Sequence, residues 1–179
     1  MRFVIALLLA CFLSHPSVAQ QTVNRTAEID LVAVTTCSLT RLADLDYGTA
    51  TKPASGSGSV TISATTGSRS ASGGVSVSGS FSAGQVRLSG DNVSSYVVSA
   101  SFPSTLTRGG SGSLSYARAW AQSASSSSGY SLISGTTYNG SGGGSVTRYF
   151  RIGGSASGIS AGDPDGTYTG TATLTASCN

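Results

Sequence analysis

The chain has 179 residues, of which only 9% are charged, and its formal net charge is +3. Its basic residues are scattered singly, which excludes the clustered basic surface of a nucleic-acid-binding protein. Serine, threonine and glycine dominate, but apolar residues are interspersed with them in regular alternation, which indicates a folded chain rather than a disordered one. This length is typical of one domain.

Residues 1–19 are predicted to be a signal peptide. A positive start at Arg2 precedes an apolar run over residues 3–13, and small residues at Ser17 and Ala19 suit the cleavage site. The run is too short to span a bilayer, which takes about 20 apolar residues. The alternative is a lipoprotein cleavage site at Cys11.

Cleavage after the leader would begin the mature chain at Gln20 and leave about 160 residues. We expect this chain to be exported, first to the periplasm and then to the cell surface or the medium, without a membrane span. The only histidine, His15, would leave with the leader.

The next segment, residues 20–36, alternates apolar and polar side chains as a half-buried strand does. Glu28 and Asp30 point to one side. The opposite side carries Val23, Ala27, Ile29, Leu31 and Ala33.

Period-two patterns then recur along residues 37–179, which we interpret as one β-domain. They cover 59–64, 75–81, 86–88, 96–102, 114–120, 130–138, 146–152 and 168–178. Asn139-Gly140 predicts a tight hairpin turn and Pro164-Asp165-Gly166 another turn. No stretch has the 3.6-residue apolar stripe of a helix. The pattern predicts an all-β protein of eight to ten short strands in an antiparallel sandwich or barrel, and a sandwich is favoured.

Two cysteines, Cys37 and Cys178, would remain in the mature chain. In an exported protein they predict one disulfide that closes nearly the whole domain. Two free thiols or a bond between chains are the alternatives.

The residues of the mature chain do not favour an enzyme. Without a histidine, no Ser-His-Asp or Cys-His arrangement can be built. The carboxylates form loose groups, which leaves a glycosidase as a minor alternative. Asp163 and Asp165 could also ligate calcium, although a structural turn is favoured. We therefore expect no catalytic residues, no cofactor and no metal.

Several short motifs resemble the bacterial domain-of-unknown-function family DUF4402 over residues 27–178. They are DLDYG at 44–48, GSVTI at 58–62, FSAGQVRLSG at 81–90, IGG at 152–154 and DGTYTGT at 165–171. The same layout is similar to the spore-coat-U-like subunits of archaic chaperone–usher pili. Gly166 lies fourteen residues from the C-terminus, as in many pilus subunits, whereas Cys178 replaces their usual aromatic penultimate residue.

This resemblance implies an immunoglobulin-like, pilin-like sandwich with one strand missing. A periplasmic chaperone would fill the open groove first, and the N-terminal strand of a neighbouring subunit would replace it after delivery to an outer-membrane usher. The donor strand would lie in residues 20–36, unless that segment is simply the first strand of its own sheet. The C-terminal strand that contacts chaperone or subunit would include Gly166, Tyr168, Ala172 and Leu174.

We therefore predict a structural subunit of a secreted fibre or pilus. The alternative is a stand-alone secreted binding module or adhesin. Four aromatic residues could provide stacking surface for glycans in such a module, or they could belong to the core. They are Tyr116, Trp120, Tyr130 and Tyr138.

Overall fold

A computed structural model describes residues 22–34, 37–109 and 111–179 of the chain. Within β1 it describes the side chains of residues 26–31 only. The predicted signal peptide and its lipoprotein alternative lie outside the described residues. The described part contains no helix that could cross a membrane.

Alternating side chains produce strands throughout the described chain, as the sequence predicted. The strands are β1 (Thr22–Val34), β2 (Cys37–Ala43), β3 (Leu45–Thr51), β4 (Ser57–Ile62), β5 (Arg69–Ser72), β6 (Ser76–Ser78), β7 (Gly84–Ser101), β8 (Thr105–Thr107), β9 (Ser113–Ser123), β10 (Ser131–Leu132), β11 (Thr137–Ser160) and β12 (Tyr168–Cys178). The all-β prediction is confirmed.

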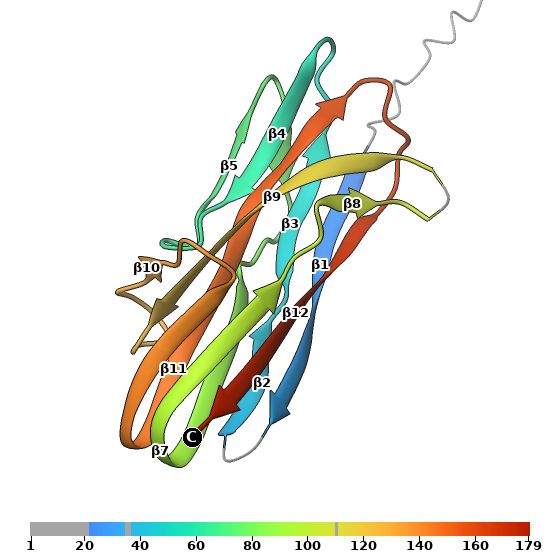
Figure 1. The fold of residues 1–179 in the computed structure, drawn as a ribbon. Coiled ribbons are helices and arrows are strands. Elements are labelled where there is room, and N and C mark those ends of the chain that lie inside the picture. The colour runs from blue at the N-terminus through green and yellow to red at the C-terminus, as the bar shows by residue number, and fades with distance from the viewer. Residues whose placement is uncertain (1–21, 35–36, 110) are drawn as a thin grey trace, which may run out of the picture.

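Hydrogen-bonded neighbours follow the order β2-β7-β11-β9-β8-β12-β1-β3-β6 (Figure 1). A further pairing between β7 and β12 closes five of these strands, β7, β11, β9, β8 and β12, into a ring. All pairs are antiparallel except β1 with β12. The molecule is therefore organised around a closed five-stranded barrel.

The ring closes because β7 changes neighbours halfway along its length. Its first part pairs with β2 from Gln85 to Gly90, and its last part pairs with β12 from Tyr96 to Ser101. Between the two parts Asn92 has a positive φ of 56°, which a regular strand does not contain. Two runs predicted as separate strands, 86–88 and 96–102, thus belong to one long bent strand.

The inward positions of these strands form one main core. Its largest fully buried side chains include Trp120, Tyr47, Tyr168 and Phe150. The Trp120 and Phe150 rings stack with 5.9 Å between centroids. The Tyr47 hydroxyl donates a 2.9 Å hydrogen bond to the Gly154 carbonyl, so this buried polar atom is satisfied.

The turn predicted at Asn139-Gly140 is wrong, because β11 includes both residues and pairs them with β7. Gly140 lies opposite Tyr96 of β7. A Cβ at Gly140 would lie 2.1 Å from the Tyr96 ring. The glycine is therefore needed to let an aromatic ring lie against the backbone, and not to reverse the chain.

Gly140→Ala is expected to destabilise the protein by at least about 2 kcal/mol, because the added methyl group overlaps the Tyr96 ring. Gly143→Ala in the same strand is the control, since a Cβ there meets nothing within 4 Å. Urea unfolding of both variants measures the difference. Equal midpoints would show that the Tyr96 ring moves aside without cost.

The strand predicted over residues 130–138 is also wrong in extent, because only Ser131–Leu132 and the first two residues of β11 are strand there. Tyr130 instead packs into a small second core with Ala64 and Ala121. The Trp120 indole nitrogen donates a 2.7 Å hydrogen bond to the Gly135 carbonyl, which holds this segment as a loop. By contrast, Pro164-Asp165-Gly166 lies in the loop that joins β11 to β12, as predicted, but the hydrogen-bonded turn of this loop is formed by residues 160–163.

Candidate functional site

β1 lies inside the sheet, between two strands from distant parts of the sequence (Figure 1). It runs parallel to β12, from Arg25 opposite Tyr168 to Val34 opposite Ser177. It runs antiparallel to β3, with its Thr22 end beside Thr51. We call the space between β12 and β3 the slot. Without β1, the facing edges of both neighbouring strands would have unpaired backbone groups.

The strand fills the slot with small and medium-sized apolar side chains. Ala27 is 1% exposed and Ile29 is 3% exposed, and Leu31 is partly buried against the same core. Glu28 and Asp30 between them are exposed, as predicted. The side chains of Val23 and Ala33 lie outside the described ones, although their backbones pair with Ala50 and Ala176.

One wall of the slot is β12, the strand predicted at the C-terminus. Tyr168, Ala172 and Leu174 are at most 1% exposed and belong to the core, while the polar residues between them face outward. Ala172 lies opposite Ile29, and Leu174 lies opposite Leu31. The structure thus pairs the predicted donor strand with the predicted C-terminal strand.

The turn that leads into β12 is fixed by two basic side chains that the sequence analysis did not single out. Lys52 is 5% exposed in its side chain and contacts the Asp163 carbonyl at 2.6 Å and the Asp165 carboxylate at 2.9 Å. Arg108 donates to the Asp165 carbonyl. Gly166 has a φ of 142°, and a Cβ there would meet the Arg108 side chain at 2.8 Å. The predicted glycine thus suits a backbone conformation that other residues rarely adopt.

The same contacts bear on the calcium alternative for this turn. Asp165 pairs with an ammonium group, and the Asp163 carboxylate accepts a 2.7 Å hydrogen bond from the Ser160 backbone. Calcium sites need six or more oxygen ligands. Among the described residues no group of three or more potential metal ligands is found. These contacts favour the structural turn.

The predicted disulfide is confirmed between Cys37, at the start of β2, and Cys178, at the end of β12. The sulfur atoms are 2.07 Å apart and the bond spans 141 positions of sequence. Every described strand except β1 lies inside this covalent loop. The covalent connection between β1 and the rest of the domain is therefore only at its Val34 end.

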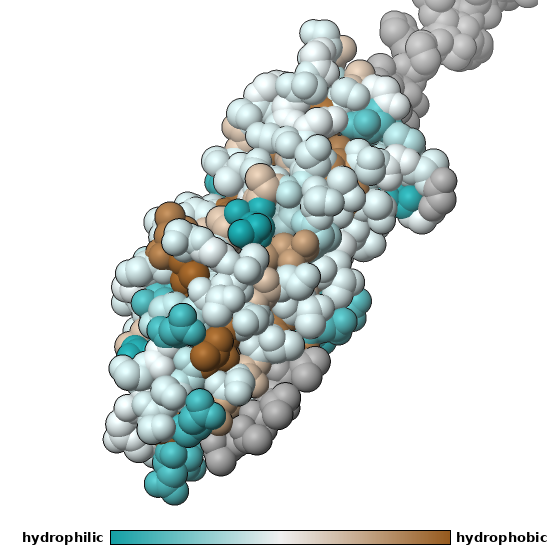
Figure 2. Space-filling view, viewed as in Figure 1, coloured by the Kyte–Doolittle hydropathy of each residue, from teal (hydrophilic) through white to brown (hydrophobic). Residues whose placement is uncertain are grey.

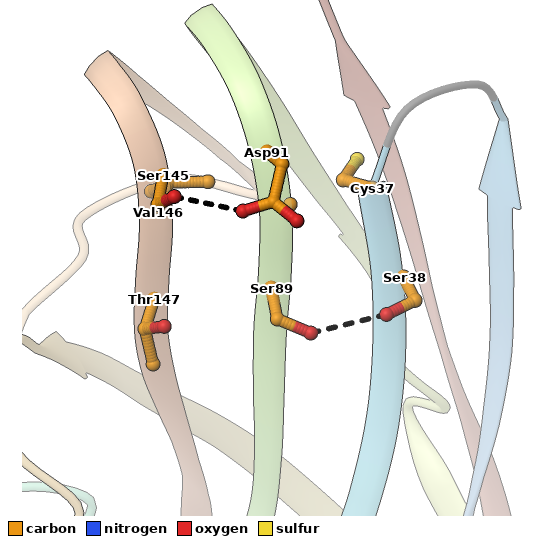
Figure 3. A pocket seen from close by; sticks show the side chains of 8 residues that line it. Cys37, Ser38, Ser89, Asp91, Ser145, Val146 and Thr147 are labelled. Carbon is orange, nitrogen blue, oxygen red and sulfur yellow. Dashed lines mark hydrogen bonds between the residues drawn. The ribbon is translucent and has the colours of Figure 1, made fainter.

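A shallow polar hollow of about 470 Å³ lies beside the disulfide, between β2, β7 and β11 (Figure 3). Ser145 donates a 2.7 Å hydrogen bond to the Asp91 carboxylate, and the hydroxyls of Ser38 and Ser89 are 3.1 Å apart. The hollow holds one carboxylate among hydroxyl groups that bond to one another. Its geometry offers neither a paired acid and base nor a nucleophile activated by a base.

Ile29→Ala is expected to lower the free energy of unfolding by about 2–4 kcal/mol, because it leaves a cavity where β1 meets the core. Glu28→Ala, one position away and exposed, is the control and is expected to change stability by less than about 0.5 kcal/mol. Thermal unfolding of both variants tests the packing of β1. Similar melting temperatures would mean that β1 does not occupy the slot in solution.

The aromatic residues considered as glycan-stacking surface belong to the interior instead. Tyr116, Trp120 and Tyr130 are 6%, 1% and 7% exposed, and Tyr138 is partly buried against the Phe150 ring at 5.7 Å. Stacking on a ligand needs an exposed ring face, so the core interpretation of these four residues is correct.

The family comparison agrees with the motifs along the chain. The model of DUF4402, described as a domain of unknown function, matches residues 37–177. The match covers the disulfide-closed domain and begins after β1. No curated protein matches the sequence. The chain therefore belongs to the DUF4402 family.

Proposed function

We propose that this protein is a structural subunit of a secreted fibre in which β1 is exchanged between copies. The observation that carries the proposal is that β1 completes the sheet, yet stands outside the disulfide-closed domain. A strand of this kind can leave its slot without breaking a covalent bond. An emptied slot would expose two strand edges and an apolar floor, which favours the addition of an equivalent strand from another chain.

The direction of β1 determines which assembly an exchange can produce. Its Val34 end lies beside Ser177, at the end of the molecule where the disulfide also lies. If β1 enters a second copy in the orientation found here, the disulfide ends of the two molecules face each other. Each copy then fills the slot of the other, and a closed dimer results.

A head-to-tail fibre requires the opposite orientation. β1 must then point away from its own domain and enter the neighbouring slot from the Tyr168 end. In that slot it runs antiparallel to β12, the reverse of the pairing within one chain. Alternation with period two allows either direction, because the apolar side chains face the floor in both cases. Head-to-tail contacts of this kind leave a free slot at one end and so continue into a filament.

The rest of the proposal follows the family resemblance. In this proposal the five-stranded barrel and its flanking strands take the place of the pilin-like, immunoglobulin-like sandwich, and β1 supplies the strand that such a sandwich lacks. The protein is exported through a signal peptide, a periplasmic chaperone holds the slot open, and an outer-membrane usher adds the subunit to the fibre at the cell surface. No catalytic step is involved.

Deletion of residues 20–33 tests the proposal in cells that display the fibre. The deletion is expected to abolish surface fibres and to leave a monomer bound to its chaperone, because the slot remains but its donor is lost. Replacement of Glu28 and Asp30 by serine is the control, since both are exposed, and it should leave assembly intact. Normal fibres from the deletion strain would contradict the proposal.

A stand-alone secreted binding module is the second candidate. Its support is that β1 fills the slot of its own chain, so a single copy has a complete sheet. Size-exclusion chromatography of the mature protein at high concentration distinguishes the two candidate functions. A monomer that never forms larger species favours the module, and concentration-dependent filaments favour the fibre.

A further inference from the structure

A second cleft lies on the barrel, formed by segments on either side of β9. It has a volume of about 530 Å³. Its lining residues come from the loop between β7 and β8, from β9, and from the loop after β10. On the face drawn in Figure 2, hydrophobic surface lies over the β9–β10 region, and hydrophilic surface lies beside that region.

Both walls of the cleft are fixed to β9 by hydrogen bonds. On one side the Tyr116 backbone nitrogen donates to the Ser104 carbonyl at 2.9 Å. On the other side the Trp120 indole nitrogen donates to Gly135 at 2.7 Å, and the Ile133 nitrogen donates to the Trp120 carbonyl at 3.0 Å. The cleft is thus held open before any ligand arrives, which reduces the entropic cost of binding.

The floor of the cleft is apolar and aromatic. Phe102, Pro103 and Ile133 are partly exposed, and the Phe102 ring packs on the edge of Trp120 with 6.1 Å between centroids. The Tyr116 hydroxyl points inward and donates 2.8 Å to the Gly153 carbonyl. Burial raises the pKa of this tyrosine, so it stays neutral and does not repel an anion.

A single positive charge stands over this floor. The Arg118 guanidinium lies 5.7 Å from the centroid of the Phe102 ring, and the residue is exposed. Within the described part of the chain Arg118 has neither an acidic partner nor a hydrogen-bond partner, whereas Arg41 pairs with Asp44 and Lys52 with Asp165. The hydroxyls of Ser104 and Ser134 stand at the exposed edge.

We propose that this cleft binds a sugar that carries a carboxylate. The two oxygens of a carboxylate match the fork of the Arg118 guanidinium. The apolar C–H face of a pyranose ring fits against Phe102, and its hydroxyl groups reach the two serines. A purely aromatic acid would leave the serine hydroxyls without partners, and a neutral sugar would leave the guanidinium without one.

The cleft is independent of strand exchange. Its lining residues lie on β9 and on loops beside it, and none of them lies in β1, β3 or β12. A fibre subunit and a stand-alone module would therefore carry it equally, and failure of one proposal leaves the other unaffected.

Trp120 provides the readout, because it is the one tryptophan of the chain and lines the cleft. Titration of the mature protein with D-glucuronate is expected to change its fluorescence in a saturable way. D-glucose has the sugar ring and hydroxyl groups but no carboxylate, and benzoate has a carboxylate but no sugar ring. Both are expected to bind at least tenfold more weakly. Binding of glucose or of benzoate as strong as that of glucuronate would overturn the assignment, and so would the lack of a saturable response to glucuronate.

Arg118→Ala should weaken glucuronate binding at least tenfold, and Arg118→Lys should restore only part of it because lysine lacks the planar fork. Arg41→Ala, an exposed arginine outside the cleft, is the matched control and should bind as the unchanged protein does. Thermal unfolding verifies that each variant is folded. Equal losses in Arg118→Ala and Arg41→Ala would mean that glucuronate binds through general charge and would overturn the proposal.

Discussion

Replacement of both Cys37 and Cys178 by alanine is expected to lower the free energy of unfolding by about 5 kcal/mol. The bond closes a loop of 141 positions, and cross-linking so long a segment removes much of the conformational entropy of the unfolded chain. For a domain of this size, a loss of that order lowers the melting temperature by roughly 10–20 °C. Calorimetry of the mature protein and the double variant measures the difference.

The control for this prediction replaces the neighbouring Ser38 and Ser177 by alanine. Both are exposed and flank the two cysteines, so the disulfide stays intact and stability should change by less than about 1 kcal/mol. If the double cysteine variant does not fold at all, urea unfolding of the unchanged protein with and without reductant gives the same comparison. Coincident unfolding curves with and without the disulfide would contradict the prediction.

Deletion of β1 is expected to have the second large effect. A chain that begins at Cys37 has unpaired edges on β12 and β3 and lacks the side chains of Ala27 and Ile29 in its core. We expect this chain to melt well below the Ile29→Ala variant and to aggregate, because exposed strand edges pair with one another. Light scattering during a thermal ramp reports both effects.

A synthetic peptide of residues 22–34 added to the shortened chain should reverse the defect. The disulfide-closed domain keeps both walls of the slot, so the free strand can bind there and raise the melting temperature with increasing concentration. A peptide with aspartate in place of Ile29 serves as the control and should give no rise. A shortened chain that is as stable as the full one would show that the slot is not a structural gap.

Much of the fold follows from the sequence because alternation is a local signal. The buried Ala27 and Ile29 and the exposed Glu28 and Asp30 follow directly from period two. The disulfide was predictable because only two cysteines remain once the predicted signal peptide is set aside. The break between β11 and β12 was predictable from the proline and glycine at positions 164 and 166.

Strand pairing was harder to predict from the sequence, because it depends on contacts between residues that are distant along the chain. The parallel pairing of β1 with β12 cannot be predicted from either segment alone. Both segments would show the same alternation of apolar and polar residues whichever strand they paired with. The bend at Asn92, which lets β7 join two different neighbours and close the ring, resembles an ordinary loop in sequence. Gly140 was misread as a turn because the Tyr96 ring that requires it lies 44 positions away.

The Lys52 and Arg108 contacts with the turn before β12 could not be predicted either. Each basic residue lies far in sequence from Asp165, and single charges among many serines carry no pattern. The Arg118 cleft likewise depends on three separate segments of the chain, which lie around residues 103, 118 and 134.

The direction in which β1 enters a second molecule tests the central claim most directly. Thr26 lies opposite Thr169 in the single chain, and Thr169 and Thr175 are exposed near opposite ends of β12. Chains with Thr26→Cys are mixed, under conditions that allow assembly, with chains that carry either Thr169→Cys or Thr175→Cys, and disulfides between chains are then measured. A head-to-tail fibre predicts cross-links to position 175, because β1 is inverted in the neighbouring slot. Cross-links to position 169 alone would indicate a closed dimer, and none at either position would mean that β1 stays with its own chain; both results would contradict the proposed fibre.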